Sequence, residues 1–550
     1  MSKLDVEAVK ANSQGLRGPI PDELQAPTDH FGDESSLLLK FHGVYQQDDR
    51  DARKTMRERG AGRDFSFMVR TKNPGGFLPA AFYLAIDRLA DEYGNGTIRV
   101  TTRAGLQLHG VRKSNLHEVI AQINAHLGST LGACGDINRN VTAAPFPFAA
   151  PEYAAARTAA VEIAELLTPR ATAYYEIWQD GEVVHSTEAA EDPIYGKAFL
   201  PRKFKIAVAV PGDNSVDLYT NDLGVVPLVD DAGTLLGFNL TVGGGLGNTH
   251  GKTATYPRLA DEFGFVPPAL LLDAVKAIVL VQRDHGDRTN RRHARLKYLI
   301  ADRGLAWFRA QVEAQAGFSL EAWRPLQAWT APQFLGWNAA GDGTWFYGVS
   351  IANGRVRDGL KAALRDIVAE LGCDLIATPD QNIVIGGIAP ALRPRIDAIF
   401  AAHGVADPQM ISVREKVAMA CPALPTCGLA LAESERVLPK LVAEIDALLE
   451  RLGVGDPVTI RMTGCPNGCA RPYMGEIGIV GVSADRYTLY LGGNPASTRL
   501  NQVFAEGVRT AEIAGVLAPL FERWSRERAA GEPFGDFCVR AVLDREKVAS

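Results

Sequence analysis

The sequence has little of what membrane-spanning, secreted or nucleic-acid-binding proteins need. None of its apolar runs approaches the roughly 18 residues that cross a bilayer as a helix. Its first ten residues, MSKLDVEAVK, carry charges where a signal peptide would have an apolar stretch. The 550 residues carry a net charge of −6, which disfavours a general nucleic-acid binder. We therefore expect a cytoplasmic protein with neither a membrane nor a nucleic acid as its partner.

Complete nucleotide-binding motifs are also missing. Residues 243–253 read GGGLGNTHGKT and look like a phosphate-binding loop, but the motif that ends in GKT needs glycine where this chain has Leu246. The G-x-G-x-x-G pattern fails as well, because its third glycine falls on Asn248 or His250. From the residues alone, the segment is a glycine-rich turn.

Cysteine is scarce, but four of the seven cysteines form two close pairs. Cys421 and Cys427 enclose five residues in CPALPTC, and Cys465 and Cys469 enclose three in CPNGC. Two such pairs that meet in space give four thiolates, the usual ligands of a [4Fe–4S] cluster. Structural zinc is the alternative, but it prefers cysteines separated by two to four residues. The wide first pair and the prolines in both loops favour the bulkier cluster, in a reducing compartment.

The order of the expected elements indicates an internal duplication. Apolar residues at helical spacing precede two short strand-like runs and a second helix, first in residues 78–127 and again in residues 358–402. Residues 98–110 and 375–387 align with the same strand–turn–strand length of 13 residues. We predict an α/β fold with mixed sheets and a pseudo-twofold core made of the two repeats.

The length of the chain predicts about three domains, because a single core rarely grows to this size. The first 35 residues are polar and either drape over the body or stay mobile. We place an N-terminal arm at residues 1–63, the two repeats at 64–145 and 331–407, an α/β domain at 146–330, and a cysteine-bearing α/β domain at 408–550. Lys203 and Lys205 precede the apolar run 206–210, so a strand that begins at the lysines would present both ammonium groups on one face.

The cysteine segments resemble those of a known family. TGCPNGCARPYM at 463–474 and CPALPTCGLA at 421–430 are similar to the signature segments of assimilatory sulfite reductase hemoproteins, within the siroheme-containing sulfite/nitrite reductase family. The similarity continues in family order at residues 41–50, 138–140, 200–205 and 237–245, and covers about residues 36–540. It implies a three-domain fold with ferredoxin-like repeats and with siroheme beside a [4Fe–4S] cluster at the junction.

The resemblance also implies residue roles. Cys421, Cys427, Cys465 and Cys469 would hold the cluster, and Cys469 would give its sulfur to the siroheme iron as well. The substrate anion would lie among Arg70, Arg139, Lys203 and Lys205. Siroheme would contact Arg99, Arg103, Gln107, His109, Arg295 and Asn467, and the backbone of the 243–253 turn would press against it. For His109, an ordinary core histidine is the alternative.

The activity that the resemblance implies is the six-electron reduction of sulfite to sulfide in sulfate assimilation and cysteine biosynthesis. Nitrite reduction by the same kind of site is the alternative, and a non-catalytic Cys₄ protein is a more remote one. Without a nicotinamide or flavin motif, the electrons must come from another protein. Residues 45–50 resemble the type served by an NADPH-dependent flavoprotein subunit, whereas residues 470–474 resemble the ferredoxin-dependent type, so both donors stay open.

Overall fold

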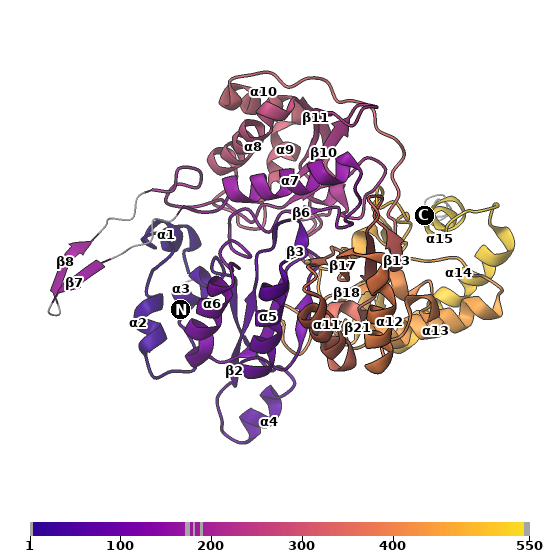
Figure 1. The fold of residues 1–550 in the computed structure, drawn as a ribbon, viewed down its shortest axis with the longest axis horizontal. Coiled ribbons are helices and arrows are strands. Elements are labelled where there is room, and N and C mark those ends of the chain that lie inside the picture. Colours follow the sequence, from indigo (N-terminus) through magenta and orange to yellow (C-terminus); the bar gives the residue numbers. More distant parts are fainter. Residues whose placement is uncertain (1–3, 171–175, 180–181, 187–190, 544–550) are drawn as a thin grey trace.

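The computed structural model describes residues 4–170, 176–179, 182–186 and 191–543. Four five-stranded sheets and one separate hairpin carry the described strands. Figure 1 shows the first repeat at the lower left, the 146–330 unit at the top and the C-terminal unit at the right, all meeting at a shared junction.

The two repeats exchange strands. The first sheet has the order β1 (Val44–Asp48), β2 (Phe65–Arg70), β5 (Leu106–Val111), β4 (Ile98–Val100) and β15 (Arg355–Val356). The second has the order β13 (Gly336–Ala339), β14 (Trp345–Val349), β17 (Ile383–Ile388), β16 (Leu375–Ala377) and β3 (Phe77–Leu78). Each sheet thus ends on a strand from the other repeat, which confirms the duplication and ties the copies into one core.

Helices of the two repeats also pack against one another, α5 (Ala80–Glu92) against α11 (Asp358–Leu371). The repeats also contain α6 (Leu116–Ala125) and α12 (Arg393–Ala402). α5 buries Phe82, Ile86 and Leu89 at helical spacing. It begins two residues later than expected, because Leu78 pairs with Leu375 in the second sheet. Lys361 of α11 lies 3.1 Å from Asp87 of α5, so the helices are also paired by charge.

The 146–330 unit is a mixed sheet covered by helices. Its strand order is β12 (Asp261–Val266), β11 (Leu235–Val242), β10 (Leu223–Val229), β9 (Ile206–Val208) and β6 (Thr142–Ala143). The helices are α7 (Pro151–Leu166), α8 (Leu271–His285), α9 (Leu296–Arg303) and α10 (Leu305–Ala316), and a hairpin of β7 (Glu176–Gln179) and β8 (Glu182–Ser186) projects from the body (Figure 1). β6 lies before residue 146, in the segment assigned to the first repeat, yet it pairs with β9. One edge strand of this sheet therefore comes from the first repeat.

The C-terminal unit places both cysteine loops at one sheet edge. Its order is β18 (Met419–Ala420), β19 (Ile460–Thr463), β20 (Ile477–Ser483), β21 (Arg486–Leu491) and β22 (Gln502–Val508), covered by α13 (Leu438–Arg451), α14 (Ile513–Glu527) and α15 (Phe534–Cys538). β18 and β19 are parallel neighbours. Cys421 follows β18 directly and Cys465 follows β19 after one glycine. Parallel strands end at the same edge, so the two loops meet there.

The first part of the N-terminal arm packs against the body, whereas α4 (Arg53–Glu58) hangs below it (Figure 1). The packed part contains α1 (Val6–Ala11), α2 (Ile20–Gln25) and α3 (Asp33–Leu38). The buried ammonium of Lys10 in α1 donates to the Leu200 carbonyl at 2.8 Å and lies 2.6 Å from Glu7. The sequence left two possibilities for the first 35 residues, draping over the body or staying mobile. From residue 4 onward, these residues drape over the body. In the described part of the chain, no helix combines the length and apolarity that a bilayer crossing requires.

Candidate active site

Four cysteines converge at the edge of the C-terminal sheet. The Gly464 N–H donates to Cys421 Sγ at 3.4 Å, and the Asn467 amide donates to Cys465 Sγ at 3.5 Å. Burial and the neighbouring thiols, Cys469 first among them, raise the pKa of Cys421, and the same causes raise the pKa of Cys465 to about 12. Without positive charge between them, these thiols stay protonated. Iron ions of a cluster would supply that charge, so the donor set fits the group that the spacing predicts.

The thiols are not arranged as a single-ion cage. Among the residues that the structure describes, no group of three or more Cys, His, Asp or Glu side chains could hold one metal ion. The thiolates on a cubane bind four different irons, so they lie farther apart than the ligands of one tetrahedral zinc. The arrangement of the four cysteines is therefore compatible with the cluster.

Cys469 is the exposed member of the four and lines a cavity at this sheet edge. Gly468 before it has φ of 66°, and a Cβ there would approach the Tyr473 ring to 2.9 Å. This tight turn directs the chain so that Asn467, Gly468 and Cys469 all line the cavity. Cys469 thus lies between the other three cysteines and this cavity.

The cavity is strongly cationic. Its lining holds five basic side chains and no carboxylate: Arg103, Lys203, Lys205, Arg295 and Arg471. Burial, with the positive charges of Arg202, Arg295 and Arg139, lowers the pKa of Lys203 to about 7. Burial and the adjacent Lys203 lower the pKa of Lys205 well below its usual value. Cations crowd in this way only at an electrostatic cost, so the chamber fits anionic occupants.

Lys203 and Lys205 do not begin a strand, contrary to the expectation from the sequence. β9 begins at Ile206, so Lys203 and Lys205 precede the strand. Their side chains nevertheless line the same cavity. The Lys205 N–H donates to Asp222 at 2.9 Å, and Asp222 also pairs with Arg295 at 2.6 Å. One buried carboxylate therefore anchors two of the five cations.

Arg70 and Arg139 come from the first repeat and are not among the residues that line the cavity. Arg70 donates to Cys134 Sγ at 2.9 Å. With the side-chain amide of Gln107 oriented so that its oxygen faces Arg70, Arg70 Nε donates to that oxygen at 2.8 Å. Arg139 Nε donates to the Gly135 carbonyl at 2.8 Å. The charge of Arg139 helps to lower the pKa of Lys203, so Arg139 lies near that cavity residue. Only Lys203 and Lys205 of the four predicted anion residues line the cavity, and a role for Arg70 and Arg139 at the anion stays a prediction. The buried thiol of Cys134 is thus a polar partner of Arg70.

The predicted siroheme contacts divide into two groups. Arg103, Arg295 and Asn467 line the cavity. Arg99, Gln107 and His109 do not: Arg99 is 1% exposed, pairs with Glu435 and donates to the Ala420 carbonyl at 2.8 Å. Burial, with the charges of Arg355, Arg99 and Arg70, lowers the pKa of His109, so its ring is neutral. Arg99 thus lies against the cysteine loop, and its contact with siroheme stays a prediction, as do those of Gln107 and His109.

The glycine-rich turn forms one wall of the cavity through Leu246 and Gly247. A Cβ on Gly244 would lie 2.2 Å from the Tyr219 carbonyl oxygen, so this turn tolerates no side chain there. Close backbone approach explains the glycines without any phosphate-binding role.

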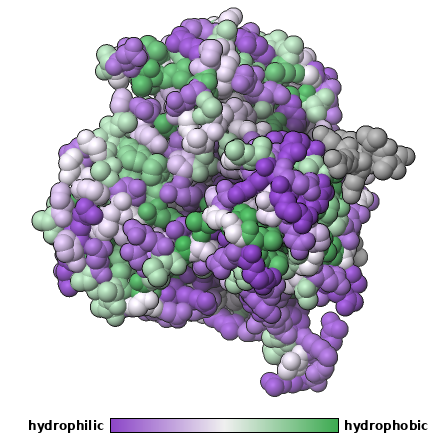
Figure 2. All heavy atoms as spheres, turned by 90° about the vertical axis from the view of Figure 1, so that its right-hand side faces the viewer, coloured by the Kyte–Doolittle hydropathy of each residue, from purple (hydrophilic) through white to green (hydrophobic). Residues whose placement is uncertain are grey.

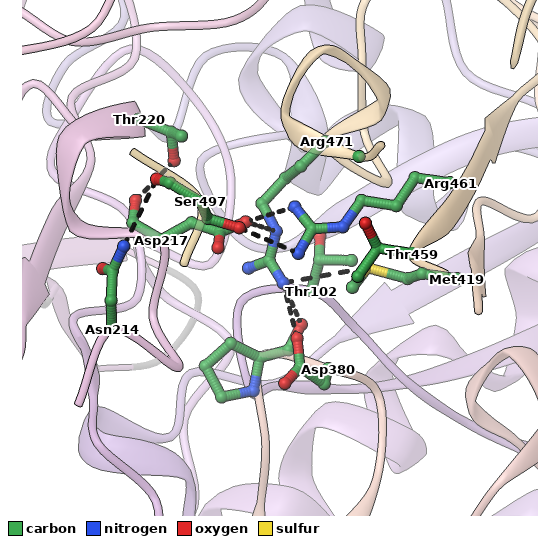
Figure 3. A network of polar contacts seen from close by, with 12 residues as sticks. Thr102, Asn214, Asp217, Thr220, Asp380, Met419, Thr459, Arg461, Arg471 and Ser497 are labelled. Carbon is green, nitrogen blue, oxygen red and sulfur yellow. Dashed lines mark hydrogen bonds and ion pairs between the residues drawn. The ribbon is translucent and has the colours of Figure 1, made fainter. Parts of the chain in front are cut away.

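Arg471 is a cavity residue that the sequence analysis missed, and it belongs to a buried ion-pair network (Figure 3). Asp217 of the 146–330 unit lies 2.6 Å from Arg461 Nη1 and 2.7 Å from Arg471 Nε. Arg471 Nη2 donates to Asp380 of the second repeat at 2.8 Å. The network joins three units two residues from Cys469. The sequence signal of Arg471 is its place in the ARPYM run, two residues after Cys469.

Replacing Asp217 with asparagine should lower the free energy of unfolding by about 3–5 kcal/mol, because two buried guanidinium groups lose their anion. Burial alone would raise the pKa of Asp217, but Arg461 and Arg471 hold it below its usual value. The stabilisation is therefore present above pH ~4 and lost as pH falls through the lower folded-state pKa. Denaturant unfolding at several pH values measures both effects.

The exposed Asp231 supplies the matched control, since Asp231→Asn removes the same charge without an ion-pair partner among the described residues. Its unfolding curve should match the parent within about 0.5 kcal/mol. Equal stability of the two variants at neutral pH would contradict the role of the network.

Comparisons with known proteins agree with this geometry. A model of the nitrite and sulphite reductase 4Fe-4S domain matches residues 159–320, and a model of the nitrite/sulfite reductase ferredoxin-like half domain matches residues 60–126 and 338–403. The second model matches once in each repeat, in agreement with the duplication. The four cysteines lie C-terminal to all three stretches.

Relatives cover the chain almost from end to end. It is 49% identical to a protein of Synechococcus elongatus named sulfite reductase [ferredoxin], over 98% of this chain and 89% of that one. It is 45% identical to the sulfite reductase [NADPH] hemoprotein beta-component of Myxococcus xanthus, over 98% and 96%. The solved structure of the NirA protein of Mycobacterium tuberculosis superposes with a TM-score of 0.80 at 24% identity, covering 99% of this chain and 97% of that one, and shows the same fold.

Proposed function

The chain belongs to the nitrite and sulphite reductase family, and from that membership we propose that it reduces sulfite to sulfide with six electrons. The observation that carries the proposal is the chamber with five basic side chains and no carboxylate, which opens directly onto Cys469. Full-length relatives named as sulfite reductases favour sulfite over nitrite as the substrate. We place the reaction in the cytoplasm, where thiolate ligands stay reduced.

The family carries siroheme and a [4Fe–4S] cluster, and the chain offers ligands for both. Cys421, Cys427, Cys465 and Cys469 would hold the cluster, with Cys469 shared by the siroheme iron. When bound, these groups store electrons and bind the sulfur of the substrate. The carboxylates of siroheme would be met by Arg103 and Arg295, whose guanidinium groups lie along the cavity wall.

The basic side chains have two tasks in such a reaction. Fixed cations replace the water around a small, strongly hydrated anion and hold its oxygens. Conversion of sulfite to hydrosulfide consumes six electrons and seven protons and releases three waters, so proton donors must lie near those oxygens. Lys203, with its pKa lowered to about 7, can release a proton at neutral pH. Lys205, in the same wall, can relay protons while Arg70 and Arg139 hold the anion.

The electrons must come from another protein, because no nicotinamide or flavin motif is present. The names of two relatives specify ferredoxin and NADPH respectively, so the family uses both kinds of donor. An electron-donor protein of one of these two kinds would dock close to the four cysteines.

The proposal predicts a coloured protein after anaerobic purification, with about four non-haem irons and one siroheme iron per chain. With reduced methyl viologen as donor, each sulfite should consume six electrons and yield one sulfide. Nitrite, assayed in parallel, should give a lower kcat/KM. Zinc in place of iron, with no visible chromophore, would contradict the proposal, and a higher kcat/KM for nitrite would reassign the substrate.

A further inference from the structure

The two cavity lysines lie at the end of a long irregular loop. Residues 191–205, which we call the lysine loop, contain no helix or strand apart from one bridge between Phe204 and Asn138. Lys203 and Lys205 at its end line the cationic cavity. A loop of this length has no helix or sheet of its own to fix a side chain. Its geometry therefore depends on contacts with the rest of the molecule.

The lysine loop makes a strained turn at Phe199, four residues before Lys203. Phe199 has φ of 53°, in the left-handed region that a bulky side chain rarely adopts. Its buried ring packs against Phe41 and Tyr195, with ring centroids 5.1 and 5.9 Å away. Such a conformation costs about 1–3 kcal/mol and persists only where the surroundings hold it. The groups that hold this turn therefore matter for the lysines that follow.

α1 of the N-terminal arm holds the turn. Asp5 caps this helix by accepting from the N–H groups of Glu7 and Ala8, both at 3.1 Å. Glu7 and Lys10 are three residues apart and so lie on one face of the helix. The fully buried Lys10 ammonium donates to the Leu200 carbonyl at 2.8 Å and lies 2.6 Å from Glu7. α1 is thus bound to the residue directly after Phe199.

Arg288 binds the same turn from the 146–330 unit. Its guanidinium donates to the Phe199 carbonyl at 2.7 Å and to the Ala198 carbonyl at 3.4 Å. Arg288 also lies 2.6 Å from Glu7. The carbonyls of residues 198–200 are therefore held by two cations, and the carboxylate of Glu7 joins those cations. Hydrogen bonds from charged donors are roughly twice as strong as neutral ones, so this is a firm attachment.

The stretch between the turn and the lysines is also held. The Leu200 N–H donates to the carbonyl of residue 136 at 2.9 Å, and the Phe204 N–H donates to that of residue 137 at 3.0 Å. Between them, Pro201 restricts its own φ. Lys203 lies within this short link, so the position of the turn determines where its ammonium lies.

We propose that α1 is a positioning element of the active site, in which Glu7 and Lys10 fix the turn at residues 198–200 and so hold the two lysines at the cavity. Glu7 and Lys10 are positioning residues, because neither lines the cavity. The inference rests on the proposed function, since it concerns the lysines that would supply protons there. The role belongs to α1 and not to the whole arm, because α4 hangs below the body in Figure 1 and forms the hydrophilic extension at the foot of Figure 2.

The test replaces Glu7 with glutamine in the holoenzyme, which keeps the shape of the side chain and removes the charge that joins Lys10 to Arg288. With reduced methyl viologen as donor, kcat for sulfite should fall about tenfold and KM should change less than about twofold. Displaced lysines transfer protons less well, whereas the cavity still attracts the anion. Arg288→Gln weakens the same turn from another unit and should give the same result. Both variants should keep the cofactor spectra of the parent.

Glu23→Gln is the matched control. Glu23 lies in α2 of the same arm and accepts from the Gly32 N–H at 2.6 Å and the Ser35 hydroxyl at 2.9 Å, both within the arm. Its kcat and KM should equal those of the parent within about twofold. Hydrogen exchange read by mass spectrometry gives a measurement independent of turnover. Exchange in residues 198–205 should be about tenfold faster in Glu7→Gln than in the parent and unchanged in Glu23→Gln.

A double substitution decides whether Glu7 acts through the lysines. In the Lys205→Met background, Glu7→Gln should lower kcat by less than about threefold, because one of the groups that it positions is already missing. An undiminished tenfold loss there would overturn the proposal. Parent-like kcat, or parent-like exchange in residues 198–205, in both Glu7→Gln and Arg288→Gln would overturn it as well. If viologen supports no sulfite reduction by the parent, the proposed function is wrong, while exchange still decides whether α1 holds the loop.

Discussion

Replacing Cys469 with serine is expected to abolish sulfite reduction. The variant should either lose both cofactors, and with them the visible absorption, or hold them without coupling between them. Cys469 is the exposed thiol of the four and the one that lines the cationic cavity. A single thiolate shared between the cluster and the siroheme iron would couple the electron store to the substrate site. Serine keeps the shape of the side chain but is a poor ligand for iron. Absorption spectra, iron content and viologen-linked turnover measure the loss.

Cys373→Ser is the control for this change. Cys373 lies in the second repeat, is half-buried, and its thiol contacts the Ile367 carbonyl at 3.9 Å, a contact that a hydroxyl can also make. Its spectrum and turnover should equal those of the parent. Thermal melting shows whether Cys469→Ser remains folded. Equal damage from both substitutions would refute the assignment of Cys469.

The sequence predicted the duplication because each repeat has its own hydrophobic periodicity and turn residues. Strand exchange could not be predicted in the same way. β3 and β15 are two residues long, and their pairing with the opposite repeat depends on how the two copies pack. The observed ends of helices and strands differ from the predicted ones for similar reasons. Leu78 was expected at the start of a helix but lies on a strand, because tertiary pairing outweighs helix propensity there.

The cysteine site was readable because spacing alone restricts four thiols to a few arrangements. The sequence did not reveal which basic side chains are held in ion pairs and which stay available to the cavity. Arg99 looks like any other arginine in the chain, yet its partner Glu435 is 336 residues away. Arg471 escaped notice because its role comes from Asp217 and Asp380 on other units. Long-range pairing of charges decides such roles, and local sequence does not encode it.

Replacing Lys205 with methionine should lower kcat for sulfite by about 10²–10³ and change KM much less. Methionine keeps most of the length of the side chain and removes the ammonium group. Lys205 shares the cavity wall with Lys203 and is anchored through its own N–H to Asp222. Proton transfer and charge stabilisation matter most in the transition state, whereas Arg70 and Arg139 would still hold the anion. Steady-state kinetics with viologen as donor measure this split.

Two further variants separate the tasks of this lysine. Lys197→Met removes an exposed ammonium eight residues earlier and should leave kcat and KM unchanged. Lys205→Arg keeps a cation that rarely gives up a proton, so it should keep the parent KM for sulfite but restore little of the turnover. Recovery of full turnover by arginine would assign Lys205 to charge stabilisation alone. Parent-like kcat and KM in Lys205→Met, with normal cofactor spectra, would mean that its ammonium is only a solvated charge and that protons reach the substrate by another path.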